Sequence, residues 1–218
     1  MTEQFPAVAP QTDKKKLLDP SSSTITFYET HADEYFRRTV SLDLSHLHNR
    51  FLSLVDPGGS ILDAGCGSGR DLRVFLNRGY QVTGIDASNA LARLAQSYSG
   101  ASCIPMRLED LSFDQRFDAV WACASLLHFP KFMLLQILRR LYRAIVPGGV
   151  LYASVQSGYG ESFASDGRFY AYYQLTEFVS LIEESGFIIN DAWNSEDSLP
   201  NRPPIQWINV LAHRDSPL

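Results

Sequence analysis

The sequence predicts an α/β fold, with helices on both faces of a mostly parallel, doubly wound β-sheet. The first observation behind this prediction is that short, continuously apolar segments alternate with amphipathic segments between residues 60 and 155. Strands buried on both faces have such apolar runs, and parallel strands need helical crossovers. The second observation is a glycine-rich loop directly after the first of these strands. Because ligands of open parallel sheets bind at the carboxyl ends of the strands, we expect a binding site there.

Composition and charge exclude several classes of protein. The chain has 218 residues, is 45% hydrophobic and carries a formal net charge of −5, which fits one globular domain and excludes disorder over the whole chain. No apolar run reaches the roughly 18 residues of a membrane span, so we expect no membrane contact. The first residues have neither the basic nor the apolar region of a signal peptide. The acidic balance argues against a nucleic-acid partner, which usually requires a basic surface.

The three cysteines, Cys66, Cys103 and Cys123, lack the spacing of a zinc site. No metal site and no disulfide framework are therefore predicted. Reduced thiols are typical of the cytoplasm, where we expect this protein to reside.

The N-terminal part is expected to have two sections. Residues 1–23 lack apolar periodicity and contain three prolines and a lysine triplet, which predicts a flexible tail. Aromatic residues at helical spacing, from Phe27 to Phe36, predict an amphipathic helix beginning near residue 24. A second helix is expected over residues 42–55. Together the two helices predict an N-terminal cap over residues 24–57.

The alternating part of the chain predicts most of the sheet. Apolar runs predict strands, amphipathic runs predict helices, and glycine or proline ends them. The expected strands are residues 60–64, 80–85, 102–106, 117–122 and 150–155. The expected helices are residues 72–77, 90–97 and 132–145, the last of them ended by a turn at 147–149.

The last third departs from this alternation. Residues 156–173 are rich in Gly, Ser and Tyr, so we expect an insert that forms a loop or lid. A helix over residues 176–185 follows, and then two strands joined by a turn at 201–204, which predicts an antiparallel addition at one edge of the sheet. We therefore expect residues 24–218 to form a single domain. The two late strands are expected at residues 187–193 and 205–212.

The glycine-rich loop is the strongest motif. It runs Asp63-Ala64-Gly65-Cys66-Gly67-Ser68-Gly69-Arg70-Asp71. Its glycines permit positive φ and a close approach of the backbone to a ligand, and Asp86 ends the next strand, where a ribose diol would bind. Dinucleotide enzymes need G-x-G-x-x-G, but Arg70 occupies the third glycine position here. The Asp63 carboxylate would repel a pyrophosphate and suits an ammonium or a sulfonium. The alternatives are a turn without a ligand and, for Asp86, a helix cap.

These motifs resemble those of a known enzyme family. Residues 63–69 together with Asp86 resemble the first two motifs of the class I S-adenosylmethionine-dependent methyltransferases. Residues 117–121 resemble the fourth-strand motif of that family, and residues 147–149 resemble its turn before the fifth strand. The resemblance covers roughly residues 25–213. It implies a Rossmann-like, seven-stranded sheet with an antiparallel last strand, and S-adenosyl-L-methionine as the cofactor.

The resemblance also implies a set of residues around the cofactor. Asp63 would face the methionine ammonium, Asp86 would accept hydrogen bonds from the ribose, and either Glu109 or Asp110 would hold the adenine amine. Arg70 would contact the methionine carboxylate or, alternatively, pair with Asp71. The residues expected to bind the cofactor are Tyr28, Asp63, Gly65, Gly67, Gly69, Arg70, Asp86, Ala87, Glu109, Asp110 and Ala122.

Methyl transfer from a sulfonium is an in-line displacement, which needs a base only when the acceptor carries a proton. His128, just past the fourth strand, is the candidate catalytic base. A histidine that caps a helix or binds a backbone carbonyl is the alternative. The candidate acceptor-binding residues are Tyr35, Glu161, Arg168 and Arg202. For Tyr28 and Tyr35 core packing is the alternative, and for Glu161 and Arg168 it is a mutual ion pair.

The acceptor class is only partly constrained. The sequence lacks the Asn-Pro-Pro-Tyr type of motif and the Pro-Cys nucleophile of nucleic-acid methyltransferases at the expected places. With the acidic net charge, this favours O- or N-methylation of a small molecule. The alternatives are a tRNA or protein methyltransferase, a non-catalytic binder of the cofactor, and a nicotinamide oxidoreductase, which Arg70 disfavours. The oligomeric state is not predicted.

Overall fold

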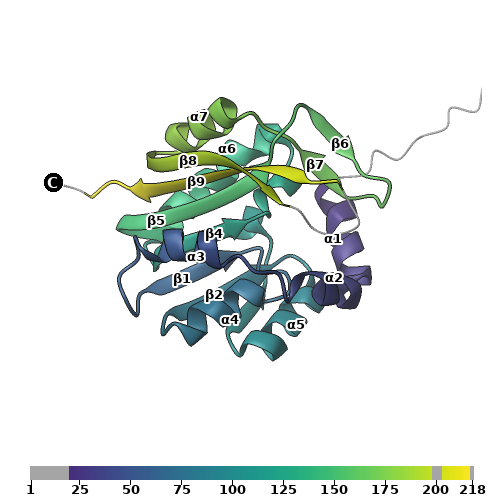
Figure 1. The fold of residues 1–218 in the computed structure, drawn as a ribbon, viewed down its shortest axis with the longest axis horizontal. Helices are drawn as coiled ribbons and strands as arrows, with labels where there is room; N and C mark the ends of the chain where they lie inside the picture. The colour runs from purple at the N-terminus through teal and green to yellow at the C-terminus, as the bar shows by residue number, and fades with distance from the viewer. Residues whose placement is uncertain (1–19, 198–202, 217–218) are drawn as a thin grey trace, which may run out of the picture.

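A computed structural model describes residues 20–197 and 203–216, and it contains a seven-stranded sheet in the order β3-β2-β1-β4-β5-β9-β8 (Figure 1). β9 pairs antiparallel with both β5 and β8, whereas β1 to β5 pair in parallel. This confirms the predicted α/β fold with an antiparallel last strand. The strands are β1 (Ser60–Ala64), β2 (Gln81–Asp86), β3 (Ser102–Pro105), β4 (Phe117–Cys123), β5 (Ile145–Gln156), β8 (Phe187–Asp197) and β9 (Ile205–Arg214).

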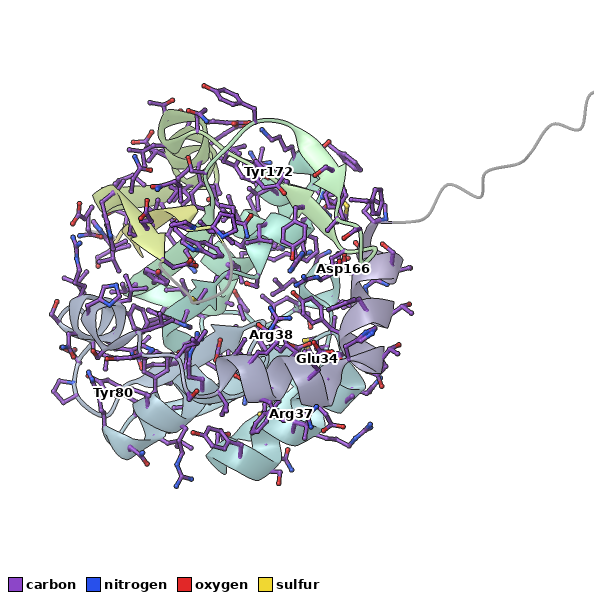
Figure 2. The ribbon with its side chains drawn as sticks, turned by 45° about the vertical axis from the view of Figure 1, so that its right-hand side comes forward. Glu34, Arg37, Arg38, Tyr80, Asp166 and Tyr172 are labelled. Carbon is purple, nitrogen blue, oxygen red and sulfur yellow. The ribbon has the colours of Figure 1, made fainter. Side chains whose placement is uncertain are left out.

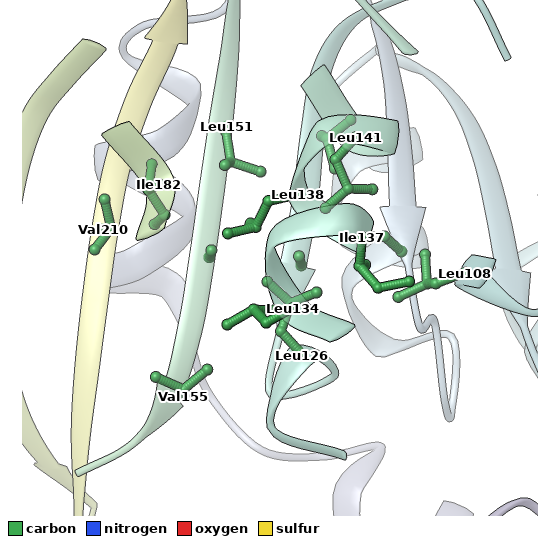
Figure 3. Packing of buried hydrophobic residues seen from close by; sticks show 14 of the residues in the cluster. Leu108, Leu126, Leu134, Ile137, Leu138, Leu141, Leu151, Val155, Ile182 and Val210 are labelled. Carbon is green, nitrogen blue, oxygen red and sulfur yellow. The ribbon is translucent and has the colours of Figure 1, made fainter. Parts of the chain in front are cut away.

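The two faces of the sheet are buried by different helices. On one face, α3 (Ser45–Leu52) and α4 (Arg70–Asn77) cover a cluster in which Trp121 stacks on Tyr152 with ring centroids 4.0 Å apart. On the other face, leucines and isoleucines of α6 (Lys131–Ala144) pack against the central strands and α7 (Leu175–Glu184) (Figure 3). Alternate residues of each strand therefore serve opposite cores, as in any doubly wound sheet.

The prediction of a turn at residues 147–149 was wrong, because these residues lie inside β5. β5 pairs with β4 from Ile145 and again from Val150, with a register shift in between. Gly148 has φ +80° there, which lets the extra residues bulge without ending the strand. The apolar pattern from residue 150 onward marked only the second, regular part of the strand.

The N-terminal part, where a cap of two helices was predicted, consists of α1 (Pro20–Thr30), α2 (Ala32–Thr39) and α3. The predicted helix from residue 24 is thus two helices, and α1 begins inside the expected tail, at Pro20, where proline suits the first turn. Residues 1–19 lie outside the described part of the chain. α1 packs against α5 (Asn89–Ser99), against the segment after β4 and against β7 of the insert.

The insert after β5 is an antiparallel hairpin of β6 (Glu161–Phe163) and β7 (Phe169–Ala171), beside α1 (Figure 1). Gly167, with φ +88°, donates its backbone N–H to the Ala164 carbonyl and forms the turn of the hairpin. The sequence predicted a loop or lid here because each strand has only three residues. Within the described ranges, no helix is both long and apolar enough to cross a membrane.

Candidate active site

A cavity lies at the carboxyl ends of β1, β2 and β4, under α1. It contains about 750 Å³ of empty space, part of which is open to solvent. One part of its wall is formed by the loops after β1 and β2, and the other part by α1 and the segment after β4. This is the edge of the sheet where the sequence predicted a binding site.

Two of the three loop glycines form the cavity wall. Gly65 has φ +95°, and a Cβ atom on it would lie 2.5 Å from the Ser125 Cβ. Gly67 has φ +52°, and a Cβ atom there would lie 3.2 Å from the Cε1 atom of Tyr35. Only glycine fits at Gly65, since both the backbone conformation and the space exclude a side chain.

Gly69, predicted to line the cofactor, lies away from the cavity. It is the N-terminal cap of α4 with φ +76°, and a Cβ atom on it would lie 2.8 Å from the backbone of Ala95 in α5. This glycine is therefore explained by the close packing of α4 and α5. The pattern in the sequence could not separate the two roles, because a packing glycine and a ligand glycine have the same spacing.

Asp86 is the last residue of β2, and it lines the cavity. Its Oδ2 accepts the Gly67 N–H at 2.9 Å and its Oδ1 accepts the Ser88 N–H at 2.9 Å. A carboxylate oxygen has two acceptor positions, so each oxygen keeps one for a hydroxyl donor. Burial raises the pKa of Asp86 to about 6, against the lowering effect of these two bonds. The cap of α5 is Ser88, not Asp86, and Ala87 lines the cavity as predicted.

Asp63 lies at the end of β1, behind the glycine loop. Its side chain is buried, and its Oδ2 has no hydrogen-bond partner among the described residues. Burial, and then the charge of Asp71, raise the pKa of Asp63 well above its usual value. A buried carboxyl oxygen without a donor fits a ligand that brings a positive charge, such as the methionine ammonium, since such a group would satisfy it.

Arg70 forms an ion pair with Asp71, which was the alternative role predicted for it. Its Nε and one terminal nitrogen each donate to Asp71 at 2.8 Å. Asp71 also accepts from the His48 Nε2 at 2.9 Å and from the Trp121 Nε1 at 2.9 Å. Burial would raise the pKa of Asp71, but Arg70 and these bonds outweigh it and hold the pKa below its usual range. His48 gave no signal in the sequence, because its partners are distant along the chain.

Of the two acids expected near the adenine, only Glu109 lies at the cavity. Glu109 lines the cavity, and its Oε1 accepts from the Arg107 guanidinium at 2.9 Å. The short 3₁₀ turn over Leu108–Asp110 brings Leu108 and Glu109 to the cavity but not Asp110. Ala122, another predicted contact, is fully buried in the core, and the next residue, Cys123, lines the cavity in its place. Successive residues of a strand face opposite sides, so the prediction missed by one position.

His128 lies in the 3₁₀ turn Leu126–His128 and has a partner on each ring nitrogen. The Nδ1 atom is 2.8 Å from the Phe169 carbonyl oxygen, and the Nε2 atom is 2.9 Å from the Tyr28 hydroxyl. A carbonyl only accepts, so Nδ1 carries the hydrogen and Nε2 accepts from Tyr28 in the neutral ring. Burial, with a contribution from Arg168, lowers the pKa of His128 to about 4. The alternative role predicted for His128, a hydrogen bond to a backbone carbonyl, is thus present. The same hydrogen bond orients the neutral imidazole ring.

Tyr28 and Tyr35 lie together at the junction of the two parts of the cavity wall, edge to face with ring centroids 5.0 Å apart. The Tyr35 ring covers Gly67. Tyr35, which was predicted to bind the acceptor, lines the cavity at the glycine loop. Tyr28 is also 5.4 Å from the His128 ring.

Arg168 approaches the cavity from the hairpin. Its guanidinium pairs with Asp166 at 2.7 Å, lies 4.5 Å from the centre of the Phe27 ring and donates to the Tyr28 hydroxyl at 3.4 Å. Figure 2 shows Asp166 at the tip of the hairpin, beside α1. The predicted alternative, a pair between Arg168 and Glu161, is wrong: Asp166 is its partner.

Glu161 does not line the cavity. It is exposed, and its Oε1 accepts the backbone N–H of Lys131 at 2.6 Å, where α6 begins. A carboxylate at this place satisfies an otherwise unpaired N–H group of the helix. Arg202, the last candidate for acceptor binding, lies outside the described residues. Within the described ranges, no group of three His, Cys, Asp or Glu side chains is placed to hold a metal ion.

Comparisons with known proteins find a methyltransferase domain in the central part of the chain. Residues 61–149 match the model of a methyltransferase domain family. Ubiquinone biosynthesis O-methyltransferase of Xanthomonas campestris pv. campestris is 34% identical over 115 residues, which are 50% of this chain and 47% of that protein. A probable tRNA methyltransferase 9B of Bos taurus is 29% identical over 147 residues, 66% of this chain and 29% of that protein. The chain spans about half the length of the first curated relatives it matches.

A solved structure extends the similarity to almost the whole chain. Burkholderia thailandensis 1,6-didemethyltoxoflavin-N1-methyltransferase, crystallised with 1,6-didemethyltoxoflavin and S-adenosylhomocysteine, superposes with a TM-score of 0.74 at 21% identity. The match covers 97% of this chain and 94% of that one. These findings show that residues 61–149 match a methyltransferase domain, and that the chain has the fold of an S-adenosylmethionine-dependent methyltransferase over almost its whole length.

Proposed function

We propose that this protein transfers a methyl group from S-adenosyl-L-methionine to an oxygen or nitrogen atom of a small molecule. One observation carries the proposal: a single cavity joins the glycine loop and Asp86, on one wall, to a second wall that contains Tyr28 and His128. Neither wall alone would support a transfer reaction, which needs two ligands in one site.

The first wall supplies the contacts that this cofactor needs. The free acceptor positions of Asp86 suit the two ribose hydroxyls, Glu109 suits the adenine amine, and the unpartnered oxygen of Asp63 suits the methionine ammonium. When bound, the cofactor supplies a methyl group on a positively charged sulfur. The Asp86 carboxylate is fixed by two backbone N–H groups, so it is already arranged before the cofactor binds.

The second wall suits a small acceptor rather than a macromolecule. α1 and the hairpin lie over the site and are joined by a hydrogen bond from the Phe169 N–H to the Thr24 hydroxyl at 2.9 Å. The wall combines apolar side chains with a tyrosine and a neutral histidine. We infer that the N-terminal cap and the hairpin form the acceptor lid of a single domain. Orientation of the acceptor oxygen or nitrogen opposite the sulfonium supplies most of the rate.

Two further aspects rest on the chemistry of the chain. The net charge of −5 supports a small-molecule acceptor over tRNA, although the bovine relative keeps tRNA as the second candidate. Cys66, Cys103 and Cys123 are free, which supports a reducing, cytoplasmic location.

The test is a labelled-cofactor assay. The purified protein is incubated with methyl-deuterated S-adenosyl-L-methionine and a panel of phenols, carboxylic acids and N–H heteroaromatic compounds, with total tRNA and a peptide mixture as parallel arms. We expect labelled methyl groups on a member of the small-molecule panel and equimolar S-adenosylhomocysteine, both measured by mass spectrometry. Label in tRNA or peptide would favour that class instead. Binding of the cofactor without product in any arm would identify a non-catalytic binder.

A further inference from the structure

The hydroxyl of Tyr28 lies between a base and a cation. It is 2.9 Å from the His128 Nε2 atom and 3.4 Å from a terminal nitrogen of Arg168. The three side chains come from α1, from the turn after β4 and from the hairpin, so the fold brings them together from distant parts of the chain. Tyr28 and His128 both line the cavity.

His128 has only one lone pair that could accept a proton. Its Nδ1–H is held by the Phe169 carbonyl, so the lone pair is on Nε2, and the Tyr28 O–H occupies it. An acceptor molecule therefore cannot give its proton to His128 directly while this contact exists. The tyrosine oxygen accepts from Arg168 and keeps a second acceptor position for the O–H or N–H group of an acceptor.

We propose that Tyr28 is the catalytic residue that takes the acceptor's proton, and that His128 receives the proton of Tyr28 as the terminal base. This proposal rests on the methyltransferase function proposed above. It assigns to Tyr28 a chemical role in place of a contact with the cofactor.

The proton and charge balance of the step is closed. The acceptor O–H or N–H gives its proton to the Tyr28 oxygen while the Tyr28 proton moves to the His128 Nε2 atom. The freed electron pair of the acceptor forms the bond to the methyl carbon, and the carbon–sulfur bond breaks with its electrons left on sulfur. The positive charge that leaves the sulfur reappears on the His128 ring, which then releases a proton to solvent. No further reactant is needed.

The electrostatics of the pair fit a relay. Burial raises the pKa of Tyr28, whereas Arg168 lowers it and so favours transient negative charge on the tyrosine oxygen. The lowered pKa of His128, about 4, keeps its Nε2 atom unprotonated at neutral pH. Because a charged ring is unstable in this buried place, the ring would not hold the proton between turnovers.

A purely structural latch is the competing explanation, and the structure allows the two to be separated. α1 is also held by the Phe169 N–H on Thr24 and by Glu29, which accepts from the Ser88 hydroxyl at 2.7 Å and from the Ala90 N–H at 3.0 Å. Removal of the Tyr28 hydroxyl therefore leaves the lid attached. A loss of rate without a loss of cofactor affinity would thus report chemistry.

The experiment compares Tyr28→Phe and His128→Gln with the wild type. The phenylalanine keeps the ring contacts, and the glutamine carbonyl can still accept a hydrogen bond from Tyr28 but cannot take its proton. We expect kcat to fall by roughly 100-fold or more in each variant, the scale of general-base catalysis, with the affinity for S-adenosylhomocysteine in calorimetry unchanged within about threefold. Tyr98→Phe, at an exposed site on α5, is the matched control and should keep the wild-type kcat.

Two kinetic outcomes would overturn the relay. An unchanged or higher kcat in Tyr28→Phe would show that freeing the Nε2 atom lets His128 act directly or that no base is needed. A parallel loss of kcat and of cofactor affinity in both variants would show that the hydrogen bond between Tyr28 and His128 only holds α1 in place. These kinetics use the acceptor found with the labelled-cofactor panel.

A measurement without an acceptor tests the same pair. In ¹⁵N-histidine spectra of the S-adenosylhomocysteine complex at neutral pH, we expect His128 as the Nδ1–H tautomer, with an Nε2 resonance that shifts in Tyr28→Phe. An Nε2–H tautomer, or a resonance that does not respond to Tyr28→Phe, would overturn the relay even if the enzyme has no known acceptor. If the panel yields no product, the proposed function fails, and the spectra still test the hydrogen bond from Tyr28 to His128 on which the relay depends.

Discussion

The two walls of the cavity are built in different ways. The wall proposed to bind the cofactor, called the cofactor wall below, uses Gly65, Gly67 and Asp86, which lie within about one βαβ unit, and its carboxylate is fixed by backbone N–H groups. The wall proposed to bind the acceptor is called the acceptor wall. The acceptor wall uses Tyr28, His128 and Phe169, whose contacts span 100 and 41 residues and depend on side chains. The first wall is therefore rigid and local, whereas the second exists only when three distant segments are packed together.

This difference teaches where specificity can vary. The backbone of the cofactor wall is determined by φ angles and strand ends, so few side chains there can change without loss of the site. The acceptor wall is held together by individual hydrogen bonds, each of which contributes about 1 kcal/mol. Single substitutions can therefore change the structure of this wall. The predictions below test this contrast, from the largest expected effect to the smallest.

Gly65→Ala should abolish measurable binding of S-adenosylhomocysteine. A Cβ atom at this position would lie 2.5 Å from the Ser125 Cβ, so the loop must shift. Gly79→Ala is the control: it has a similar φ, +87°, but nothing lies within 4 Å of the added atom, so only the left-handed strain of about 1–2 kcal/mol remains. Calorimetry and thermal unfolding of both variants measure the contrast. Equal cofactor binding by the two variants would contradict a rigid cofactor wall.

Asp86→Ala should weaken binding of S-adenosylhomocysteine by about 1.5–3 kcal/mol, the scale of hydrogen bonds to a charged group. The reason is that the ribose hydroxyls lose their acceptor while the loop glycine loses its carboxylate partner. Titration calorimetry gives the change directly. Asp33→Ala, on the exposed surface of α2, should bind like the wild type, and the ribose role of Asp86 is wrong if both variants do.

Cofactor affinity should fall as the pH is lowered through about 6, where Asp86 becomes protonated and loses an acceptor position. The same raised pKa makes the unliganded fold lose stability as the pH rises from about 4, the usual value, to about 6, with no further change above that. Asp86→Asn should flatten this part of the binding curve between pH 5 and 8 while Asp63 is left in place. A curve with the same midpoint in the variant would assign the titration to Asp63 or another group.

Thr24→Val should have the smallest effect and should act on the acceptor wall alone. It removes the hydroxyl that accepts the Phe169 N–H, at a cost of about 1 kcal/mol. We expect faster hydrogen exchange in α1 and β7 and a higher acceptor KM, with little change in cofactor affinity. Thr26→Val, on the exposed side of the same helix, is the control for the substitution itself. Similar exchange in the two variants would mean that this bond does not hold the lid.

The cofactor wall was largely predictable because its signals are local. Gly65, Gly67, Asp86 and Ala87 were expected at the cavity and line it. The errors there came from contacts between elements: Gly69 packs against α5, and the strand register places Cys123 instead of Ala122 at the cavity. Neither the approach of two helices nor a one-residue register can be read from spacing alone.

The acceptor wall was predictable only as a set of candidates. Tyr28, His128 and Arg168 were each predicted as site residues, but their mutual contact could not be predicted. Glu161 instead accepts the backbone N–H of Lys131, the first residue of α6. The partner of Arg168 depends on the turn of the hairpin. This turn places Asp166, which is two residues earlier in the chain, next to the Arg168 guanidinium. Long, charged side chains choose among several partners, and folding decides which one is near.

The amino-acid sequence by itself determined the order of strands and helices, the antiparallel last strand and the glycine loop beside Asp86, since apolar periodicity, glycine and a carboxylate at a strand end act within a few residues. Only the tertiary structure decided that Asp71 gathers His48, Arg70 and Trp121, and that Tyr28 occupies the lone pair of His128. These hydrogen bonds need atoms within about 3 Å, and residues far apart in the chain reach that distance only when the helices and strands pack.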